Sequence, residues 1–306
     1  MVSYFSRRIL QGALTLYIAI TIAFLLGRAT GKPAALILTE GASQEQINDL
    51  NGRLGFNDPI GLQYINYFGD LLRGNFGVSY RNPGQSAIDI IMERLPATMT
   101  LALTAFVIGL VLAVIAAALI HITGSAALRA LFVWNGSLRQ SVPDFFFGVV
   151  LVLVFSVALG WLPSLGFNGT PSLILPVATI ATAQFVLYVR LLDSSLSEQS
   201  GEDYVRTAYA RGKSHASVVV TEMLPNAFLP ILTVAGLNLA SLLGGTIIVE
   251  QVFAWPGVGL ALIGAVSQRD FAVVQAGLLV VAVIFVVVNV AVDLLYSIID
   301  PRVKLS

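Results

Sequence analysis

Apolar residues are gathered into long runs that alternate with polar stretches along the chain. Six runs approach the length of about 20 residues that an α-helix needs to cross the hydrocarbon core of a bilayer. No charged side chain interrupts the second run before His121, or the fifth between Glu222 and Glu250. We therefore predict an all-α polytopic membrane protein with six transmembrane helices, at Ile9–Ala29, Ala97–Ile120, Val142–Leu162, Leu173–Leu192, Ala227–Val249 and Ala272–Tyr296.

The composition agrees with a surface that lipid covers. Of the 306 residues, 57% are hydrophobic and 11% are charged, whereas about 25% of the residues of a soluble domain are charged. The formal net charge is zero, so no basic excess indicates a nucleic-acid partner. The chain has no cysteine, which excludes disulfides, thiolate metal sites and cysteine catalysis.

The basic residues predict the side of the membrane on which each polar segment lies. The first run follows Arg7 and Arg8, exceeds the length of a signal-peptide core and lacks a small-residue cleavage site, so we expect a retained helix with a cytoplasmic N-terminus. The two short outer loops, 163–172 and 250–271, then hold one basic residue, Arg269, which satisfies the positive-inside rule. The C-terminus is also expected in the cytoplasm, because the inner basic residues are Arg7, Arg8, Arg129, Arg139, Arg190, Arg206, Arg211, Lys213, Arg302 and Lys304.

A long polar region separates the first two spans. We divide the chain into residues 1–29 (N-terminal segment and first span), an extracytoplasmic region 30–96, and a transmembrane core 97–306. Gly, Asn and Pro punctuate the outer region, which predicts short helices joined by turns. Ser43 and Gln46 have the spacing of a capping box at one helix start. The region is either a lid over the outer face or a docking surface for a soluble partner.

The longest polar segment on the expected inner side is the loop 193–226. An apolar stripe at helical spacing predicts a short amphipathic helix there, formed by Tyr204, Val205, Ala208 and Tyr209. Gly212 can adopt positive φ, which suits the end of that helix or a sharp turn. A second short helix is expected to end at Leu224, before Pro225. The alternative is a solvated loop.

The sequence offers no catalytic, cofactor or metal motif. It lacks the phosphate-binding GxxxxGK[ST] loop, the HExxH zinc motif and the GxSxG elbow, and its two histidines are His121 and His215. Energy for transport must then come from a partner or from an ion gradient. Ion-coupled carriers usually hold ionisable residues within their spans. The candidates here are Asp144 and Asp293, which we interpret as helix caps or ion-pair partners rather than proton relays.

At the inner loop the sequence resembles a known family. Arg206-Thr207-Ala208-Tyr209-Ala210-Arg211-Gly212, followed by Glu222 and Leu224-Pro225, is similar to the "EAA…G…I-LP" loop of permease subunits in binding-protein-dependent ABC importers. The wider segment Glu202–Ala208 is similar to the variant "EDYVRTA" of the dipeptide, oligopeptide and nickel permeases. Arg206, Thr207 and Glu222 depart from the general pattern, and Thr30-Gly31-Lys32-Pro33 replaces the usual "PGDP" after the first span.

The resemblance extends over nearly the whole chain. Further matching motifs occur in the expected order: Leu54-Gly55-Phe56-Asn57-Asp58-Pro59-Ile60, Gly74-Asn75-Phe76-Gly77-Val78-Ser79, Arg94-Leu95-Pro96-Ala97-Thr98, Gly160-Trp161-Leu162-Pro163, Val249-Glu250-Gln251-Val252-Phe253-Ala254-Trp255-Pro256-Gly257 and Asp300-Pro301-Arg302-Val303. It implies the helical bundle of a type I ABC importer permease in a bacterial plasma membrane. It also implies a second, similar permease subunit, expected to differ from this one, two ATPase subunits that bind ATP and Mg, and an external binding protein.

The resemblance also implies roles for particular residues. The inner loop is expected to act as a coupling helix in a groove of the ATPase, through Tyr204, Arg206, Thr207, Ala208, Tyr209, Arg211, Gly212, Leu224 and Pro225. Trp255, Pro256 and Gly257 form either an outer gate or binding-protein contact, or an interfacial aromatic anchor. The substrate is a dipeptide, a longer peptide, a nickel complex or another small solute. A carrier or channel driven by an ion gradient and a membrane-embedded enzyme remain as alternatives.

Overall fold

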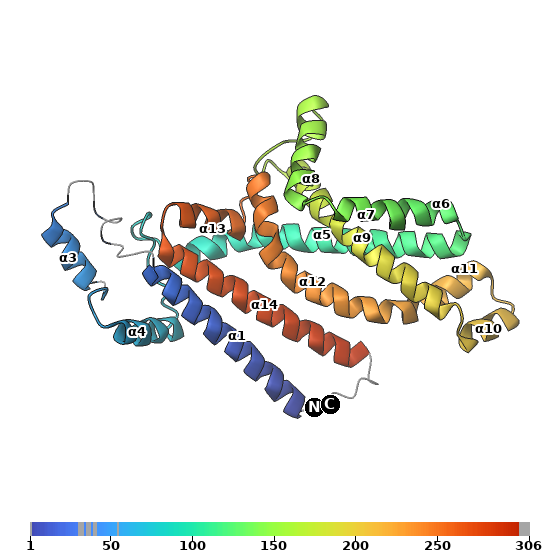
Figure 1. The fold of residues 1–306 in the computed structure, drawn as a ribbon, viewed down its shortest axis with the longest axis horizontal. Coiled ribbons are helices and arrows are strands. Elements are labelled where there is room, and N and C mark those ends of the chain that lie inside the picture. Colours follow the sequence, from blue (N-terminus) through green and yellow to red (C-terminus); the bar gives the residue numbers. More distant parts are fainter. Residues whose placement is uncertain (1, 30–33, 35–37, 39–41, 54, 300–306) are drawn as a thin grey trace. The chain divides into compact units, whose positions relative to one another are not determined.

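The structure, a computed structural model, is built from helices over the residues that it describes. These are residues 2–29, 34, 38, 42–53 and 55–299. Val78 and Ser86 form an isolated antiparallel bridge between two short loop segments. The helical elements (Figure 1) are α1 (Val2–Ala29), α3 (Gln44–Arg53), α4 (Ile60–Leu72), α5 (Ala87–Thr123), α6 (Ala126–Arg129), η1 (Ala130–Trp134), α7 (Asn135–Gln140), α8 (Asp144–Leu151), η2 (Val152–Ala158), η3 (Thr170–Leu173), α9 (Ile174–Gln199), α10 (Asp203–Ala210), α11 (His215–Val218), η4 (Val219–Met223), α12 (Leu224–Val252), α13 (Val258–Ser267) and α14 (Phe271–Ile299).

Five of the six predicted spans are long apolar helices, which confirms the all-α membrane fold. They are Arg8–Ala29, Ala87–Thr123, Thr170–Gln199, His215–Leu242 and Phe271–Val292. The second begins at Ala87 rather than at Ala97, and Pro96 lies inside it. The motifs Thr30-Gly31-Lys32-Pro33 and Asp300-Pro301-Arg302-Val303, as well as Leu54, lie outside the described residues.

The third predicted span, Val142–Leu162, is shorter than expected. It is helical from Asp144 to Ala158, and it joins the preceding helix Ala126–Gln140 at a bend of 107°. Pro143 precedes α8 and has no N–H to continue a helix across the corner. At the other end, Gly160 takes a φ of +65°, which a helix does not accommodate. The third predicted span is therefore present only as one arm of a bent pair.

Arg139 holds this corner together. Its Nη2 atom lies 2.7 Å from Asp144 Oδ1, donates to the Thr179 carbonyl at 2.8 Å, and its Nε atom donates to Thr182 Oγ1 at 3.1 Å. The guanidinium also lies over the Phe147 ring, 4.1 Å from its centroid. Asp144 is thus an ion-pair partner, as predicted, although its helix shows no side-chain cap. The side chain of Asp293 is not among those that the structure describes.

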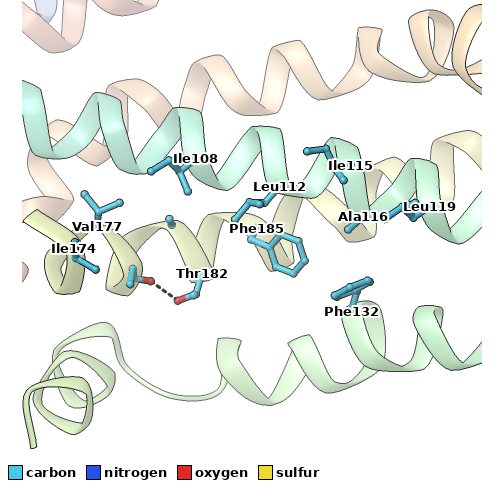
Figure 2. Close-up of a pocket in the computed structure, with 12 residues that line it drawn as sticks. Ile108, Leu112, Ile115, Ala116, Leu119, Phe132, Ile174, Val177, Thr182 and Phe185 are labelled. Carbon is cyan, nitrogen blue, oxygen red and sulfur yellow. Dashed lines mark hydrogen bonds between the residues drawn. The ribbon is translucent and has the colours of Figure 1, made fainter. Parts of the chain in front are cut away.

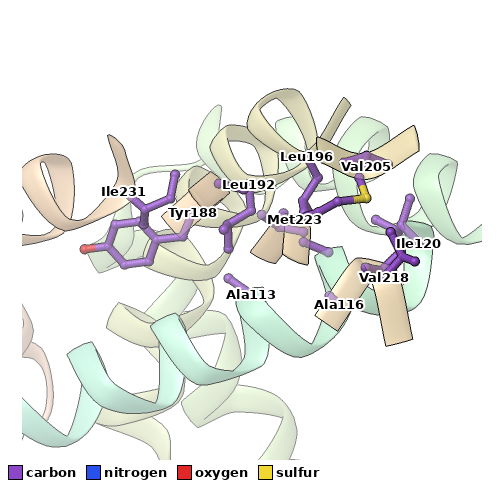
Figure 3. Packing of buried hydrophobic residues seen from close by; sticks show 14 of the residues in the cluster. Ala113, Ala116, Ile120, Tyr188, Leu192, Leu196, Val205, Val218, Met223 and Ile231 are labelled. Carbon is purple, nitrogen blue, oxygen red and sulfur yellow. The ribbon is translucent and has the colours of Figure 1, made fainter. Parts of the chain in front are cut away.

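The chain divides into two compact units, of which one comprises Thr98–Trp255 and residues 288–299. Its core joins α5, α9 and α12 to the short helices between α9 and α12 (Figure 3). A groove of about 550 Å³ opens between α5, α9 and η1, lined by side chains such as Leu112, Phe132 and Phe185 (Figure 2). The Thr182 hydroxyl in its wall donates back to the Ala178 carbonyl at 2.8 Å. The groove therefore suits apolar groups rather than a charged solute.

The other unit comprises residues 2–97 and Pro256–Val287. The predicted capping box is confirmed: Gln46 N donates to Ser43 Oγ at 3.2 Å, and Ser43 N donates to Gln46 Oε1 at 2.8 Å. Asp270, between α13 and α14, is buried and accepts hydrogen bonds from the Ser79 hydroxyl and from Tyr80 N. This carboxylate clasp fixes the loop before α5 to the turn before α14.

Candidate functional site

The inner loop forms a compact knob between α9 and α12. Figure 1 shows α10 and α11 together at the same end of these two long helices. Residue 202 precedes α10 in an extended conformation, and Asp203 lies in its first turn, where the helix dipole favours a negative charge. Two short helices at a bend were predicted, and the solvated-loop alternative is wrong for this segment.

One side of α10 is fixed to the transmembrane core. Val205 and Ala208 are 2% and 5% exposed and belong to the same buried cluster as Leu196, Val218 and Met223 (Figure 3). Such a cluster makes the short helix part of the rigid bundle, since isolated helices of this length are unstable in water. Three residues of the stripe expected from the sequence, Tyr204, Val205 and Ala208, therefore face the core, whereas Tyr209 is 41% exposed.

Tyr204 and Leu224 lie at the edge of this cluster, half-buried. The Tyr204 hydroxyl donates to Gln199 Oε1 at 2.5 Å, which connects α10 to the last turn of α9. Burial raises the pKa of the Tyr204 hydroxyl further above neutral pH, so the group is protonated and can donate this bond.

The opposite side of α10 faces outward. Arg206 is paired with Asp203 at 3.5 Å, yet the arginine side chain is 76% exposed, so this pair contributes little stability. Other predicted coupling residues on this surface are Thr207, Tyr209, Arg211 and Gly212. The surface thus combines two arginines with a tyrosine, residue types that are enriched at protein–protein interfaces.

Gly212 ends α10 as predicted. It has a φ of +80°, the left-handed conformation that glycine adopts without strain. Gly212 N donates to the Tyr209 carbonyl at 2.9 Å, and Lys213 N donates to the Ala208 carbonyl at 3.3 Å. These two bonds form the Schellman motif, which satisfies the last carbonyls of the helix.

The predicted end of the second helix at Leu224 is wrong. α11 continues through the π-helical turn η4 into α12, so Pro225 lies in the first turn of a long helix rather than after a short one. A proline ring clashes with the carbonyl four residues earlier in a regular α-helix. A π-helical turn is wider, and the turn Val219–Met223 stands immediately before the proline position. The sequence motif therefore marks a continuous connection from the knob to span five.

Several polar residues that anchor the knob were missed by the sequence analysis. His215 Nε2 lies 2.9 Å from the His121 carbonyl oxygen, and since that oxygen only accepts, the histidine donates. In the neutral ring Nδ1 then accepts from the Tyr209 hydroxyl at 2.6 Å, with the two rings stacked. Lys213 and Glu222 form an ion pair across the turn. Residue type did not indicate these contacts: the His121 carbonyl lies 94 positions from His215, and the nearer pairs meet only because the turn at Gly212 brings them together.

A second polar group anchors the C-terminal end of α5. The His121 ring donates from Nε2 to Asp193 Oδ1 at 3.0 Å, and Arg129 pairs with the same oxygen at 3.0 Å. His121 thereby connects α5 to α9 through its side chain and to α11 through its carbonyl. Within the described ranges, no group of three or more His, Cys, Asp or Glu side chains is arranged to hold a metal ion.

The segment after α12 is held by contacts with the loop that contains Gly166 and Phe167. Trp255 is 1% exposed, and its ring meets Phe167 edge-to-face at 5.3 Å. Phe253 accepts a hydrogen bond at its carbonyl from Gly166 N at 2.8 Å. Trp255 is therefore buried rather than an exposed interfacial anchor. Pro256 and Gly257 follow, and Gly257 precedes α13 in an extended conformation.

Glu250 is a buried carboxylate that the sequence analysis overlooked. It lies inside α12, is fully buried, and accepts at Oε1 from the Thr98 hydroxyl at 2.7 Å and from the Thr246 hydroxyl at 3.2 Å. The expectation that Asp144 and Asp293 were the ionisable candidates of the spans is thus wrong. The apparent end of the apolar run at Glu250 hid the fact that the helix continues to Val252.

The family described as "Binding-protein-dependent transport system inner membrane component" matches residues 125–305, and its N-terminal companion matches residues 1–102. This chain belongs to that permease family.

Relatives match the permease over its whole length. The oligopeptide transport system permease protein AppB of Bacillus subtilis (strain 168) is 33% identical over 316 residues, covering 99% of this chain and all of the relative. The dipeptide transport system permease protein DppB of Alkalihalophilus pseudofirmus is 34% identical over 334 residues, with 99% and 100% covered. The expected family is thus confirmed.

Solved structures of ABC transporters share the fold of this chain. A chain of the MetNI methionine ABC transporter in an inward-facing conformation superposes with a TM-score of 0.54 at 15% identity, over 69% of the permease and 96% of that chain. The permease is a membrane-spanning subunit of an ABC importer, and it is not an enzyme, since ATP hydrolysis in such systems belongs to a separate subunit.

Proposed function

We propose that the permease forms half of the path by which a peptide crosses a bacterial inner membrane. The support for a peptide is the similarity to oligopeptide and dipeptide permeases over 99% of the chain. The other half is a similar but non-identical permease subunit. A binding protein outside the membrane delivers the peptide, and two ATPase subunits inside bind ATP and Mg.

The knob is the proposed contact with the ATPase. The observation that carries this proposal is its two-sided construction: Val205 and Ala208 are buried in the bundle core, while Arg206, Tyr209 and Arg211 are exposed. A push on the exposed side is transmitted directly to α9 and α12, because α10 cannot shift without disturbing that core. ATP binding can drive inward and outward access only if the ATPase holds the knob differently in the two states.

With the knob assigned to the ATPase contact, we also propose how the permease is oriented in the membrane. The knob and the basic residues around it lie in the cytoplasm, together with both chain termini, and the 30–96 region lies outside. Trp255, Pro256 and Gly257 then lie at the outer end of span five. We assign this segment to an outer gate, because Trp255 and Phe253 are buried and fixed to the loop before α9 at residues 166–167.

The absence of cysteine from the sequence allows a direct test by single-cysteine crosslinking. Arg206→Cys and Tyr209→Cys place a thiol on the exposed side of the knob, and Val205→Cys, one residue away, is the buried control. In the assembled importer, the exposed thiols should crosslink to the ATPase subunit, with a yield that changes when ATP is added. The assembled importer that gives these crosslinks should also take up peptide, and the peptide-loaded binding protein should stimulate its ATPase activity. Equal crosslinking from all three positions, or none, would contradict the assignment.

A further inference from the structure

Helix α4, in the outer region, packs along the C-terminal half of α1. The Thr21 hydroxyl lies 2.8 Å from the Tyr64 hydroxyl, and Phe24 meets the Tyr64 ring edge-to-face at 5.2 Å. The contact continues toward the middle of α1, where Tyr17 meets Phe68 with ring centroids 6.5 Å apart. One side of α4 is therefore occupied by a transmembrane helix.

This contact places α4 at the depth of the bilayer. Between Tyr17 and Ala29 the helix α1 rises about 18 Å, at ~1.5 Å per residue. The hydrocarbon core is about 30 Å thick, and α1 spans it from Arg8 to Ala29. Phe68 thus reaches well into the hydrocarbon. Only 11% of the most apolar stretch of α1 is buried, so α1 itself presents a lipid-facing surface beside α4.

The free side of α4 has the chemistry of a lipid-facing surface. Leu62, Ile65 and Leu72 are 46%, 67% and 77% exposed, and they recur on one side of the helix. Asn66 and Asp70, four residues apart, lie on a polar edge beside them. A helix with one apolar side and one polar edge is typical of segments that lie in a membrane interface.

We propose that α4 is inserted into the leaflet at the C-terminal end of α1, with Leu62, Ile65 and Leu72 in contact with phospholipid acyl chains. A soluble binding protein fits this surface less well, because the α4–α1 contact extends to mid-span. Arg28 is consistent with the headgroup level: it ends α1, and its guanidinium lies 3.9 Å from the centroid of the Phe56 ring. This inference goes beyond the proposed transport function. For α4, it takes the place of the two earlier interpretations of the outer region, a lid and a docking surface for a soluble partner.

The test uses the assembled importer in phospholipid nanodiscs, with one cysteine per variant carrying an environment-sensitive NBD label. Ile65→Cys and Leu72→Cys report on the apolar side, and Asn66→Cys is the matched control on the polar edge. Leu14→Cys on α1 gives a lipid reference, and Glu45→Cys on α3 gives an aqueous reference. Quenching is measured with doxyl groups on lipid acyl chains and with iodide in water.

Labels at Ile65 and Leu72 should lose most of their fluorescence to the doxyl lipids and resist iodide, as at Leu14. The label at Asn66 should be quenched more by iodide than the label at Ile65. If the Ile65 label prevents assembly, Leu62→Cys reports on the same side. Iodide quenching at Ile65 equal to that at Glu45 would overturn the proposal. Shielding from both quenchers, or shielding from iodide that appears only when the binding protein is added, would overturn it equally, since a protein then covers α4.

Discussion

Replacing Gly212 by valine tests whether the turn of the knob is needed for coupling. The φ of +80° at this position is strained for any residue with a side chain. No atom lies within 4 Å of the point that a Cβ atom would occupy there, so the cost of the substitution is a backbone cost rather than a steric clash with neighbours. A left-handed conformation costs about 1–2 kcal/mol for a residue other than glycine.

That free energy corresponds to a factor of about 5–30 in the population of the native turn. If the turn rearranges instead, the hydrogen bonds from Gly212 N and Lys213 N are lost, at about 0.5–1.5 kcal/mol each. In the molecules whose turn has rearranged, α10 no longer presents Arg206 and Arg211 in the native orientation. We therefore expect Gly212→Val to lower peptide uptake and binding-protein-stimulated ATPase activity together, by roughly tenfold.

Two control variants separate this explanation from a general sensitivity of the loop. Gly212→Asn should retain most activity, because asparagine tolerates the left-handed conformation. Gly201→Ala, in the same exposed loop, should be neutral, because Gly201 does not have positive φ and its Cβ would make only an ordinary contact at 3.7 Å. Uptake and ATPase activity are measured in proteoliposomes. Full activity of the valine variant, or an equal loss in the alanine variant, would refute the reasoning.

Two further substitutions test the polar anchors. His215→Gln, whose amide can still donate to the His121 carbonyl, should retain coupling. His215→Ala should lower uptake per ATP hydrolysed, and it should destabilise the complex by ~0.5–1.5 kcal/mol for each of the ring's two hydrogen bonds. Identical behaviour of the two variants would show that the bond to the His121 carbonyl is unimportant. Arg139→Met should destabilise the complex by about 1–3 kcal/mol, since hydrogen bonds from the charged guanidinium are lost at the corner before α8. Asp144→Asn should destabilise the complex less, because the Asp144 side chain is 51% exposed. A melting temperature of the Arg139 variant equal to that of the unmodified complex would contradict the role of the corner.

Features set by local sequence were predictable. The long apolar helices follow from run length, and the Ser43 capping box and the Gly212 turn follow from the bonding preferences of a few neighbouring residues. The two short helices of the knob were visible in the spacing of apolar residues. None of these features depends on a partner that is distant in sequence.

Features that depend on distant partners were not predictable. The corner before α8 is held by Arg139, whose acceptors on α9 cannot be identified from spacing. In span five, a Cβ added at Gly244 would meet open space, while at Gly236 it would approach Val292 to 2.1 Å, a contact that only the folded structure reveals. The burial of Glu250 likewise could not be predicted from the sequence, because the hydroxyl that donates to it, that of Thr98, lies on another helix.

The Asp270 clasp has a consequence for the order in which the protein is built. Ser79 and Tyr80 leave the ribosome long before their acceptor, which lies about 190 positions further along. Synthesis proceeds from the N-terminus at about 5–20 residues per second, so the loop before α5 waits roughly ten seconds or more for its carboxylate. The loop before α5 is thus completed by one of the latest segments of the chain, and nascent chains that stop short of Asp270 lack the bond that closes it.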